Sequence, residues 1–172
     1  MIFGKKNSKS SQKASVKKNN RHFVLIEVTA DLIFPEIVLW GEAIWWPPKS
    51  SMKFTRLTPG AIQVGTKYQQ KVLLPLAPKW EAQVTNLIPG RLIERIFLNG
   101  IFRGKETVII EERYDGMKVD YLMEYEILGL FNKMMWGMHF QKLHDKNIEM
   151  ILKALKEHVL KKKNEVLKGR SQ

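Results

Sequence analysis

Residues 91–127, RLIERIFLNGIFRGKETVIIEERYDGMKVDYLMEYEI, contain three strand-like runs separated by two short turns. The turns are the Asn-Gly pair at 99–100 and the Asp-Gly pair at 115–116, and both dipeptides favour the tight turn of a β-hairpin. Runs rich in β-branched and aromatic residues between such turns are typical of strands. The stretch therefore predicts three consecutive antiparallel strands at 91–98, 102–114 and 118–127.

Alternation within the run 118–127 separates two faces. One face carries Val119, Tyr121, Met123, Tyr125 and Ile127, whereas the other is mostly charged. Because successive side chains of a strand point to opposite sides, the first set is expected to face the interior. The two tyrosines and the methionine between them would then line an apolar space and offer it two hydroxyl groups. The alternative is that both hydroxyls reach solvent at the rim.

The pattern continues on the N-terminal side of this stretch. Further strands are expected at 53–57, 66–74 and 79–88, because proline- and glycine-containing turns separate these runs. A first strand is expected at 22–30. Between them, 31–46 has apolar spacing that suits a helix, with Gly41 dividing it into two short helices and Pro47-Pro48 ending it.

After Gly129 the apolar period returns to that of a helix, and one long helix is predicted over 130–163. Its second half has a single apolar stripe, which includes Ile148, Ile151 and Leu155. Its first half, 130–140, is apolar on nearly every side. A helix of that kind must be covered all round, so the sheet is expected to wrap this first half.

This order of elements resembles the helix-grip fold of START lipid-transfer domains, polyketide cyclases and dehydrases, and birch-pollen-allergen-like proteins (the SRPBCC superfamily). The resemblance covers about residues 22–160. The segments that carry it are Leu32-Ile33-Phe34-Pro35-Glu36-Ile37-Val38, Trp45-Trp46-Pro47-Pro48, Pro59-Gly60 followed by Gly65-Thr66, Asp115-Gly116 before the last strand, and the closing helix from Gly129 to Val159.

The resemblance implies an α+β fold in which a curved antiparallel sheet of about seven strands surrounds a long C-terminal helix, with an apolar cavity between them. Members use that cavity for lipids, isoprenoids, polyketides or aromatic compounds, and fold alone does not choose among these. A protein that binds or carries a hydrophobic small molecule without catalysis is favoured. One alternative is a cyclase- or dehydratase-type enzyme that uses His139 and the cavity tyrosines. Another is a peripheral membrane or partner adaptor that acts through basic tails.

The candidate ligand-binding residues extend beyond the last strand. His139 lies in the apolar half of the helix, where an imidazole could act as acid or base, or could simply be a buried histidine bonded to a carbonyl. Met135 and Met138 would give the cavity an adaptable wall, and Trp45 an aromatic one. Arg103 and Glu106 lie three apart on one strand and therefore on opposite faces; if Arg103 faced inward, it would suit an anionic group.

Several chemistries find no support in the sequence. The chain has no cysteine, so disulfides, thiolate metal sites and cysteine nucleophiles are excluded. His139 and His144 are five apart on the helix, which does not suit a metal pair. No phosphate-binding glycine loop, dinucleotide motif or Gly-x-Ser-x-Gly elbow occurs. No metal and no cofactor are predicted.

The net charge of +12 is carried by the two ends of the chain. Residues 1–21 contribute +7 and are expected to be a disordered basic tail, with a domain at 22–163 and a second basic tail at 164–172. Residues 22–152 carry no net charge, and this disfavours nucleic acid as a partner. The tails could give weak contact with anionic membranes. Without a secretory signal, a cytoplasmic location is predicted, although an organelle transit peptide stays an alternative.

Overall fold

The computed structural model describes residues 18–75 and 77–169, and the expectations for 1–17 and 170–172 lie outside this part of the chain. The fold is α+β, as predicted. Its elements are β1 (Lys18–Ile26), α1 (Ala30–Val38), β2 (Met52–Arg56), β3 (Lys67–Val72), β4 (Lys79–Ile88), β5 (Leu92–Phe97), β6 (Phe102–Arg113), β7 (Gly116–Ile127), α2 (Leu130–Met135), the π-helical segment η1 (Trp136–Phe140) and α3 (Gln141–Gly169).

The seven strands form one antiparallel sheet in the order β1-β7-β6-β5-β4-β3-β2. The two hairpin turns predicted from 91–127 are confirmed, and β6 and β7 pair from Phe102↔Ile127 to Arg113↔Gly116. Gly100 has φ +88°, and a Cβ there would collide with Trp80, so the Asn-Gly turn needs glycine for both reasons. β1 closes the order by returning to pair with β7.

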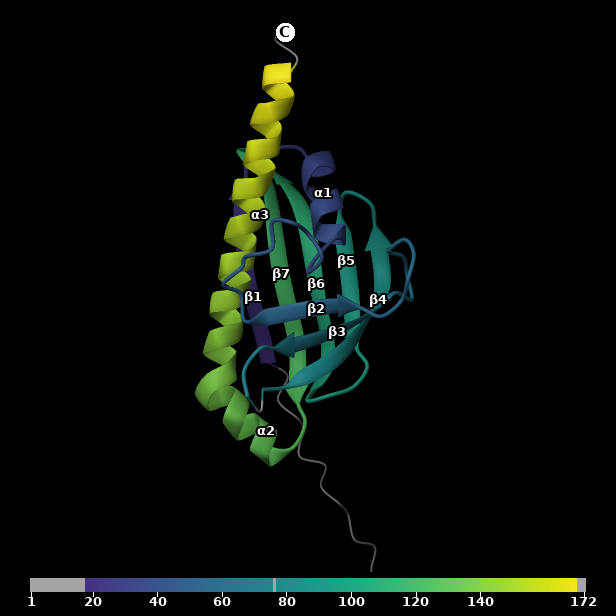
Figure 1. Ribbon diagram of the computed structural model, residues 1–172, viewed down its shortest axis with the longest axis vertical. Helices are drawn as coiled ribbons and strands as arrows, with labels where there is room; N and C mark the ends of the chain where they lie inside the picture. The colour runs from purple at the N-terminus through teal and green to yellow at the C-terminus, as the bar shows by residue number, and fades with distance from the viewer. Residues whose placement is uncertain (1–17, 76, 170–172) are drawn as a thin grey trace, which may run out of the picture.

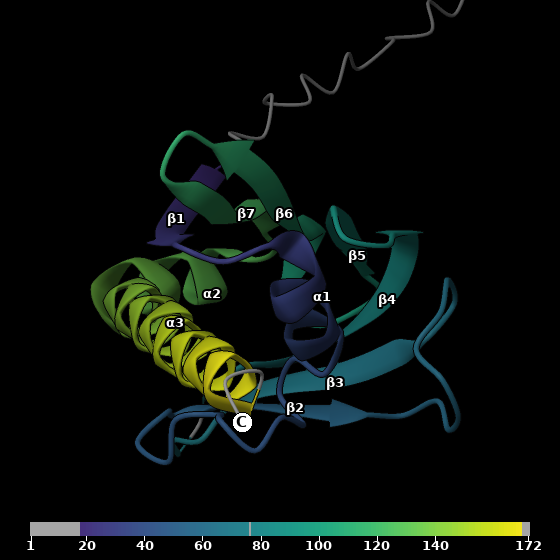
Figure 2. The same ribbon diagram turned by 90° about the horizontal axis from the view of Figure 1, so that it is seen from above.

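The sheet is strongly curved. β2 and β3 run across the direction of β5, β6 and β7, and the sheet curls around the space beside α3 (Figures 1 and 2). The register of β4 shifts between Val84 and Asn86, an irregularity of the kind that bends strands.

Helix α3 is tied to both edges of the sheet. On the β1 side, Asn20 donates to Asp145 of the helix. On the β2 side, Asn147 accepts the backbone N–H of Ser51 at 2.8 Å and the hydroxyl of Ser50 at 2.9 Å. The helix therefore closes the open side of the sheet, and the core lies between the two.

Only one helix follows the first strand, so the expected pair of short helices is wrong. α1 ends at Val38, and 39–46 forms turns. Gly41, three residues beyond the end of α1, adopts φ +84° and lies close against Phe54, so the chain turns here and does not start a second helix. Trp40 and Trp46 have edge-to-face contacts with Phe54, so burial of large aromatic rings, not helical spacing, determines this segment.

The expectation that the sheet wraps residues 130–140 is also wrong. In α2 and η1 only Trp136 and Phe140 are buried, and four large apolar side chains of this stretch are exposed. The reason is position: α2 lies at the end of the sheet, where strands can cover one side only (Figure 1). The buried stripe belongs to α3 and includes Ile148, Ile151 and Leu155. Within the described residues, no helix is long and apolar enough to cross a bilayer.

Candidate functional site

Polar side chains enter the concave side of the sheet at alternate strand positions. On β5 the buried residues are Ile93, Arg95 and Phe97, so an arginine lies between two apolar neighbours. Similar positions on other elements complete a group that we call the interior polar cluster: Gln70 of β3, Arg95 of β5, Glu106 of β6, Tyr121 of β7 and His144 of α3, each at most 1% exposed.

Glu106 is the centre of the cluster. Its Oε1 accepts hydrogen bonds from Gln70 at 2.6 Å and from Arg95 Nη1 at 3.2 Å. Its Oε2 accepts the hydroxyl of Tyr121 at 3.1 Å. Trp80 in turn donates to the side-chain oxygen of Gln70 at 2.6 Å, which fixes the orientation of the amide. A buried carboxylate with three donors is well satisfied, so its position is tightly held.

Arg95 is satisfied on one side only. Its Nη1 donates to Glu106, whereas Nε and Nη2 are buried and have no hydrogen-bond partner within the described chain. These two nitrogens form the edge of the guanidinium that binds pairs of oxygen acceptors. The buried hydroxyl of Tyr68, whose ring centroid lies 5.3 Å from the guanidinium carbon, and the indole N–H of Trp40 also have no partner there.

The cluster extends from Glu106 to the helix through Tyr121. The Tyr121 hydroxyl lies 3.5 Å from His144 Nε2, and His144 Nδ1 lies 3.4 Å from the side-chain nitrogen of Asn20. Trp40 stacks on the Tyr121 ring at 6.2 Å. Burial raises the pKa of Tyr121 well above its ordinary value, and the negative charge of Glu106 raises it further. Tyr121 is therefore a neutral hydroxyl near pH 7.

The structure buries four of the residues singled out from the sequence. Tyr121, Met123 and Tyr125 all lie on the concave face of β7 and are at most 1% exposed. The Tyr125 hydroxyl accepts the indole N–H of Trp136 at 3.0 Å, so it is inside rather than at a solvent-exposed rim. Trp45 is also buried, but it lies beyond α1, where it donates to Glu36.

The remaining candidates lie elsewhere. Met135 is partly buried against the core, whereas Met138 and His139 are exposed on η1. His139 is therefore not the buried imidazole that the apolar pattern suggested; His144, five residues further on, is. Arg103 is also exposed and lies 3.8 Å from Glu126. Of the pair on β6, it is Glu106 that points inward.

Sequence reasoning missed Arg95 and His144 and left the direction of Glu106 open. Strand alternation was the available signal, because Arg95 shares the face of Ile93 and Phe97, and Glu106 that of Val108 and Ile110. A charged residue on an otherwise apolar face is the feature to look for. For His144 the signal was its spacing of four from the buried Ile148.

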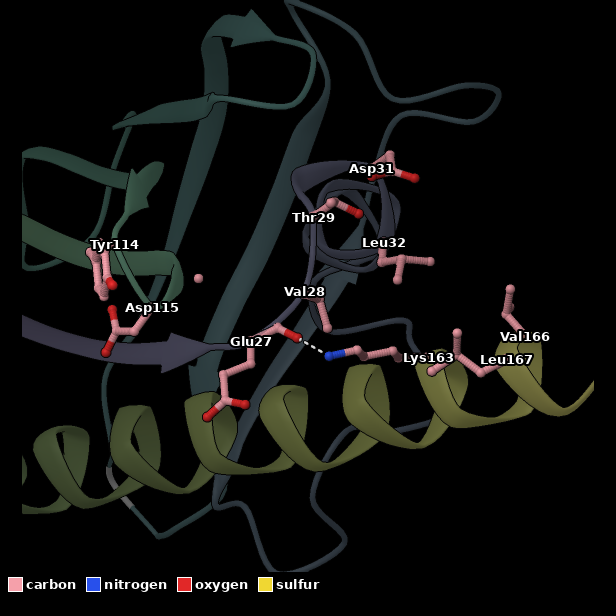
Figure 3. Close-up of a pocket in the computed structure, with 11 residues that line it drawn as sticks. Glu27, Val28, Thr29, Asp31, Leu32, Tyr114, Asp115, Lys163, Val166 and Leu167 are labelled. Atoms are coloured by element: carbon pink, nitrogen blue, oxygen red, sulfur yellow. Dashed lines mark hydrogen bonds between the residues drawn. The ribbon is translucent and has the colours of Figure 1, made fainter.

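A second candidate is a groove at the end of the molecule opposite α2, which we call the terminal groove. It has a volume of about 720 Å³ and is bounded by the β1–α1 link, the β6–β7 turn and the C-terminal part of α3. Figure 3 shows Val28 and Leu32 on one side and Lys163 and Val166 on the other, with Lys163 donating to the carbonyl of Glu27. The interior polar cluster lines neither this groove nor four further hollows on the surface of the described chain.

Across the described ranges, no group of three or more His, Asp or Glu side chains is arranged to hold a metal ion.

The chain matches no protein-family model and no curated protein sequence. It does match solved structures of low sequence identity. A norcoclaurine synthase from Thalictrum flavum, determined with dopamine and hydroxybenzaldehyde, is 16% identical, with 94% of this chain and 96% of that chain covered at a TM-score of 0.62. An aromatase/cyclase from a Streptomyces species is 15% identical, with 84% and 94% covered and a TM-score of 0.58. A major latex-like protein of Panax ginseng is 10% identical, with 83% and 97% covered and a TM-score of 0.58. The fold of this chain is therefore the helix-grip fold.

Proposed function

We propose that this protein binds a hydrophobic small molecule between the sheet and α3, and that the molecule places an oxygen acceptor against the free edge of Arg95. The observation that carries the proposal is the pair of unpartnered, buried N–H groups on Nε and Nη2. Leaving buried donors unpaired costs about 1–3 kcal/mol for each, so a fold that retains them is suited to an acceptor from outside the chain. The same face of the sheet carries buried apolar residues at neighbouring strand positions, including Phe97, Val108 and Met123, and these suit a hydrophobic body.

Charge decides which acceptor fits. Glu106 already balances the charge of Arg95, and three donors hold its carboxylate. A ligand carboxylate would add a second negative charge to this buried site without a counter-ion, and that costs several kcal/mol. A neutral carbonyl, such as that of a ketone, ester or quinone, accepts the same N–H groups without this cost. We therefore assign a neutral carbonyl compound to the site.

The interior polar cluster is preferred to the terminal groove. The groove has a suitable volume, but its lining includes the acidic residues Glu27, Asp31 and Asp115, and Lys163 already donates to the Glu27 carbonyl. The free donors of the interior make it the better match for a carbonyl.

The test is a fluorescence titration with Nile red, a neutral apolar dye that carries a ring carbonyl. Wild-type protein is expected to bind about one dye molecule per chain with a blue-shifted emission. The double variant Arg95→Met/Glu106→Gln removes the charge pair together and is expected to lose about tenfold in affinity, the equivalent of one good hydrogen bond. Equal affinity in both proteins would contradict the proposal.

Two controls place the dye. Arg103→Met changes an exposed arginine on the neighbouring strand and should leave the affinity unchanged. Val166→Ser alters the terminal groove and should also leave it unchanged. A loss of binding in Val166→Ser with none in Arg95→Met/Glu106→Gln would move the site to the groove.

A second candidate function is proton-transfer catalysis in the same interior, in place of the His139 mechanism. The observation that favours it is the continuous row of Glu106, Tyr121 and His144. A neutral Tyr121 could donate to an oxygen that gains negative charge, with Glu106 as the neighbouring base. The test is Tyr121→Phe: bound carbonyl compounds are extracted after incubation and analysed by mass spectrometry. Chemical conversion by the wild type that is lost in Tyr121→Phe supports an enzyme, whereas unchanged compounds from both support a carrier.

A further inference from the structure

Four exposed apolar side chains form a continuous face on α2 and η1, which we call the α2 patch. Leu130 is 86% exposed, Phe131 70%, Met134 51% and Met138 59%. At about 100° per residue these positions fall within an arc of roughly 100°, so they share one side of the helix. Large apolar side chains gathered in this way mark an interaction surface more often than single exposed ones do.

The opposite side of the same segment holds the patch in place. Trp136 is fully buried; its ring lies 4.6 Å from that of Phe102, and its indole N–H donates to Tyr125. Phe140 is also buried. The segment therefore cannot rotate its apolar face inward without removing Trp136 from the core. The exposure of the α2 patch follows from how the segment is anchored.

The sequence that contains the α2 patch is basic. Residues 127–144 contain Lys133 and Lys142, both exposed, and no acidic residue. The acidic residues that flank this range are engaged elsewhere, Glu126 with Arg103 and Asp145 with Asn20.

The basic N-terminal segment joins the molecule at this same end. β1 begins at Lys18, which pairs with Tyr125 near the end of β7, and α2 follows β7 within a few residues (Figure 1). Residues 1–17 carry five lysines and no acidic residue. The described chain therefore starts, after a lysine-rich segment without acidic residues, at the end of the fold that carries the α2 patch.

We propose that the α2 patch docks on the surface of an anionic lipid bilayer, with Phe131, Met134 and their neighbours at the acyl boundary and the exposed Lys133 and Lys142 against the headgroups. An exposed apolar helix face next to basic residues is the arrangement by which interfacial helices bind membranes. The two contributions reinforce each other, since basic residues near an anionic leaflet each add to the affinity. This docking is independent of the ligand proposed above.

The test is co-sedimentation of the full chain with vesicles of phosphatidylcholine containing roughly 30 mol% phosphatidylserine, compared with pure phosphatidylcholine. Wild-type protein is expected to sediment with the anionic vesicles, and less so as salt rises from roughly 0.1 to 0.5 M, because salt screens exposed charges. The variant Phe131→Ser/Met134→Ser is expected to bind at least about tenfold more weakly. Both side chains are exposed, so circular dichroism should show an intact fold.

A matched control is Ile44→Ser/Val64→Ser, which removes two exposed apolar side chains, 95% and 59% exposed, from other parts of the surface. It should bind vesicles as the wild type does. Equal binding by the Phe131→Ser/Met134→Ser variant would overturn the proposal and assign any membrane contact to the tails alone. Absence of binding by the wild type would also overturn it. So would self-association of the wild type that this variant abolishes, because a second copy would then cover the α2 patch.

Discussion

Arg95 and Glu106 form a buried ion pair at 3.2 Å, each with about 1% of its side chain exposed. Such pairs are seldom a source of net stability, because removing two charges from water costs about as much as their attraction returns. Here the arginine is, in addition, only half satisfied. A pair of this kind is better explained by a role in ligand binding than by a role in folding. Its contribution to folding can be measured in single and double variants.

Replacing the arginine alone should be costly. Arg95→Met leaves Glu106 without its counter-charge, and we expect the free energy of unfolding in urea to fall by about 3–5 kcal/mol. Arg95→Met/Glu106→Gln removes both charges and should recover most of that loss. The exposed Arg103→Met should change stability by no more than about 0.5 kcal/mol. An Arg95→Met protein as stable as the wild type would show that Arg95 does not compensate Glu106.

Asp120 on β7 should make stability depend on pH. Its burial alone would raise the pKa of the carboxyl, but hydrogen bonds from Arg21 at 2.9 Å and Lys118 at 2.7 Å more than offset this, and the net pKa lies below its ordinary value. A carboxyl with a lowered pKa stabilises the folded state above its unfolded pKa of about 3.9, and that contribution is lost as pH falls through the folded value.

Asp120→Asn is therefore expected to lower the free energy of unfolding by about 1–3 kcal/mol at pH 7. The difference from the wild type should shrink below about pH 4, where the wild-type carboxyl also becomes protonated. Urea denaturation of both proteins across this range checks the prediction. A difference that stays constant down to the acid limit would mean that the carboxylate charge is not responsible.

Most strands followed from the sequence, but β1 covers Lys18–Ile26 and not the expected 22–30, and the helices followed only in part. The turns at 99–100 and 115–116 set two hairpins locally, and alternation then placed Tyr121 and Tyr125 inside. The helical segment 130–140 could not be predicted in the same way. Its exposure depends on where the sheet ends. That position is set by the assembled fold and cannot be read from the apolar composition of the segment.

The segment of α2 and η1 should depend on Trp136. Trp136→Ala removes a fully buried ring and is expected to cost about 3–5 kcal/mol of unfolding free energy. Trp136→Phe keeps an aromatic ring near Phe102 and should cost less, although Tyr125 loses its donor. Hydrogen exchange should show faster exchange at 130–140 in Trp136→Ala than in Trp136→Phe. Unchanged protection of that segment in Trp136→Ala would show that another contact anchors it.

In the whole molecule, α3 joins the two edges of the curved sheet. The two ends of the molecule differ in their surfaces. One end carries the terminal groove and the other the α2 patch. Between them lies an interior with a polar cluster in apolar surroundings. The long-range contacts that build this cluster come from β3, β5, β6, β7 and α3. Sequence spacing assigned residues to the faces of single elements. It could not predict that residues from these five elements would contact one another.

Binding of a carbonyl at Arg95 can be tested on the nuclear magnetic resonance signal of the Arg95 Nε–H group, identified by its absence in Arg95→Met. The Nε–H has no partner within the described chain. With a saturating neutral carbonyl compound such as Nile red, we expect a downfield shift of this proton as it gains an acceptor, while the Nε–H of the exposed Arg103 stays unchanged. A bound dye that leaves the Arg95 signal where it was would contradict carbonyl binding at Arg95.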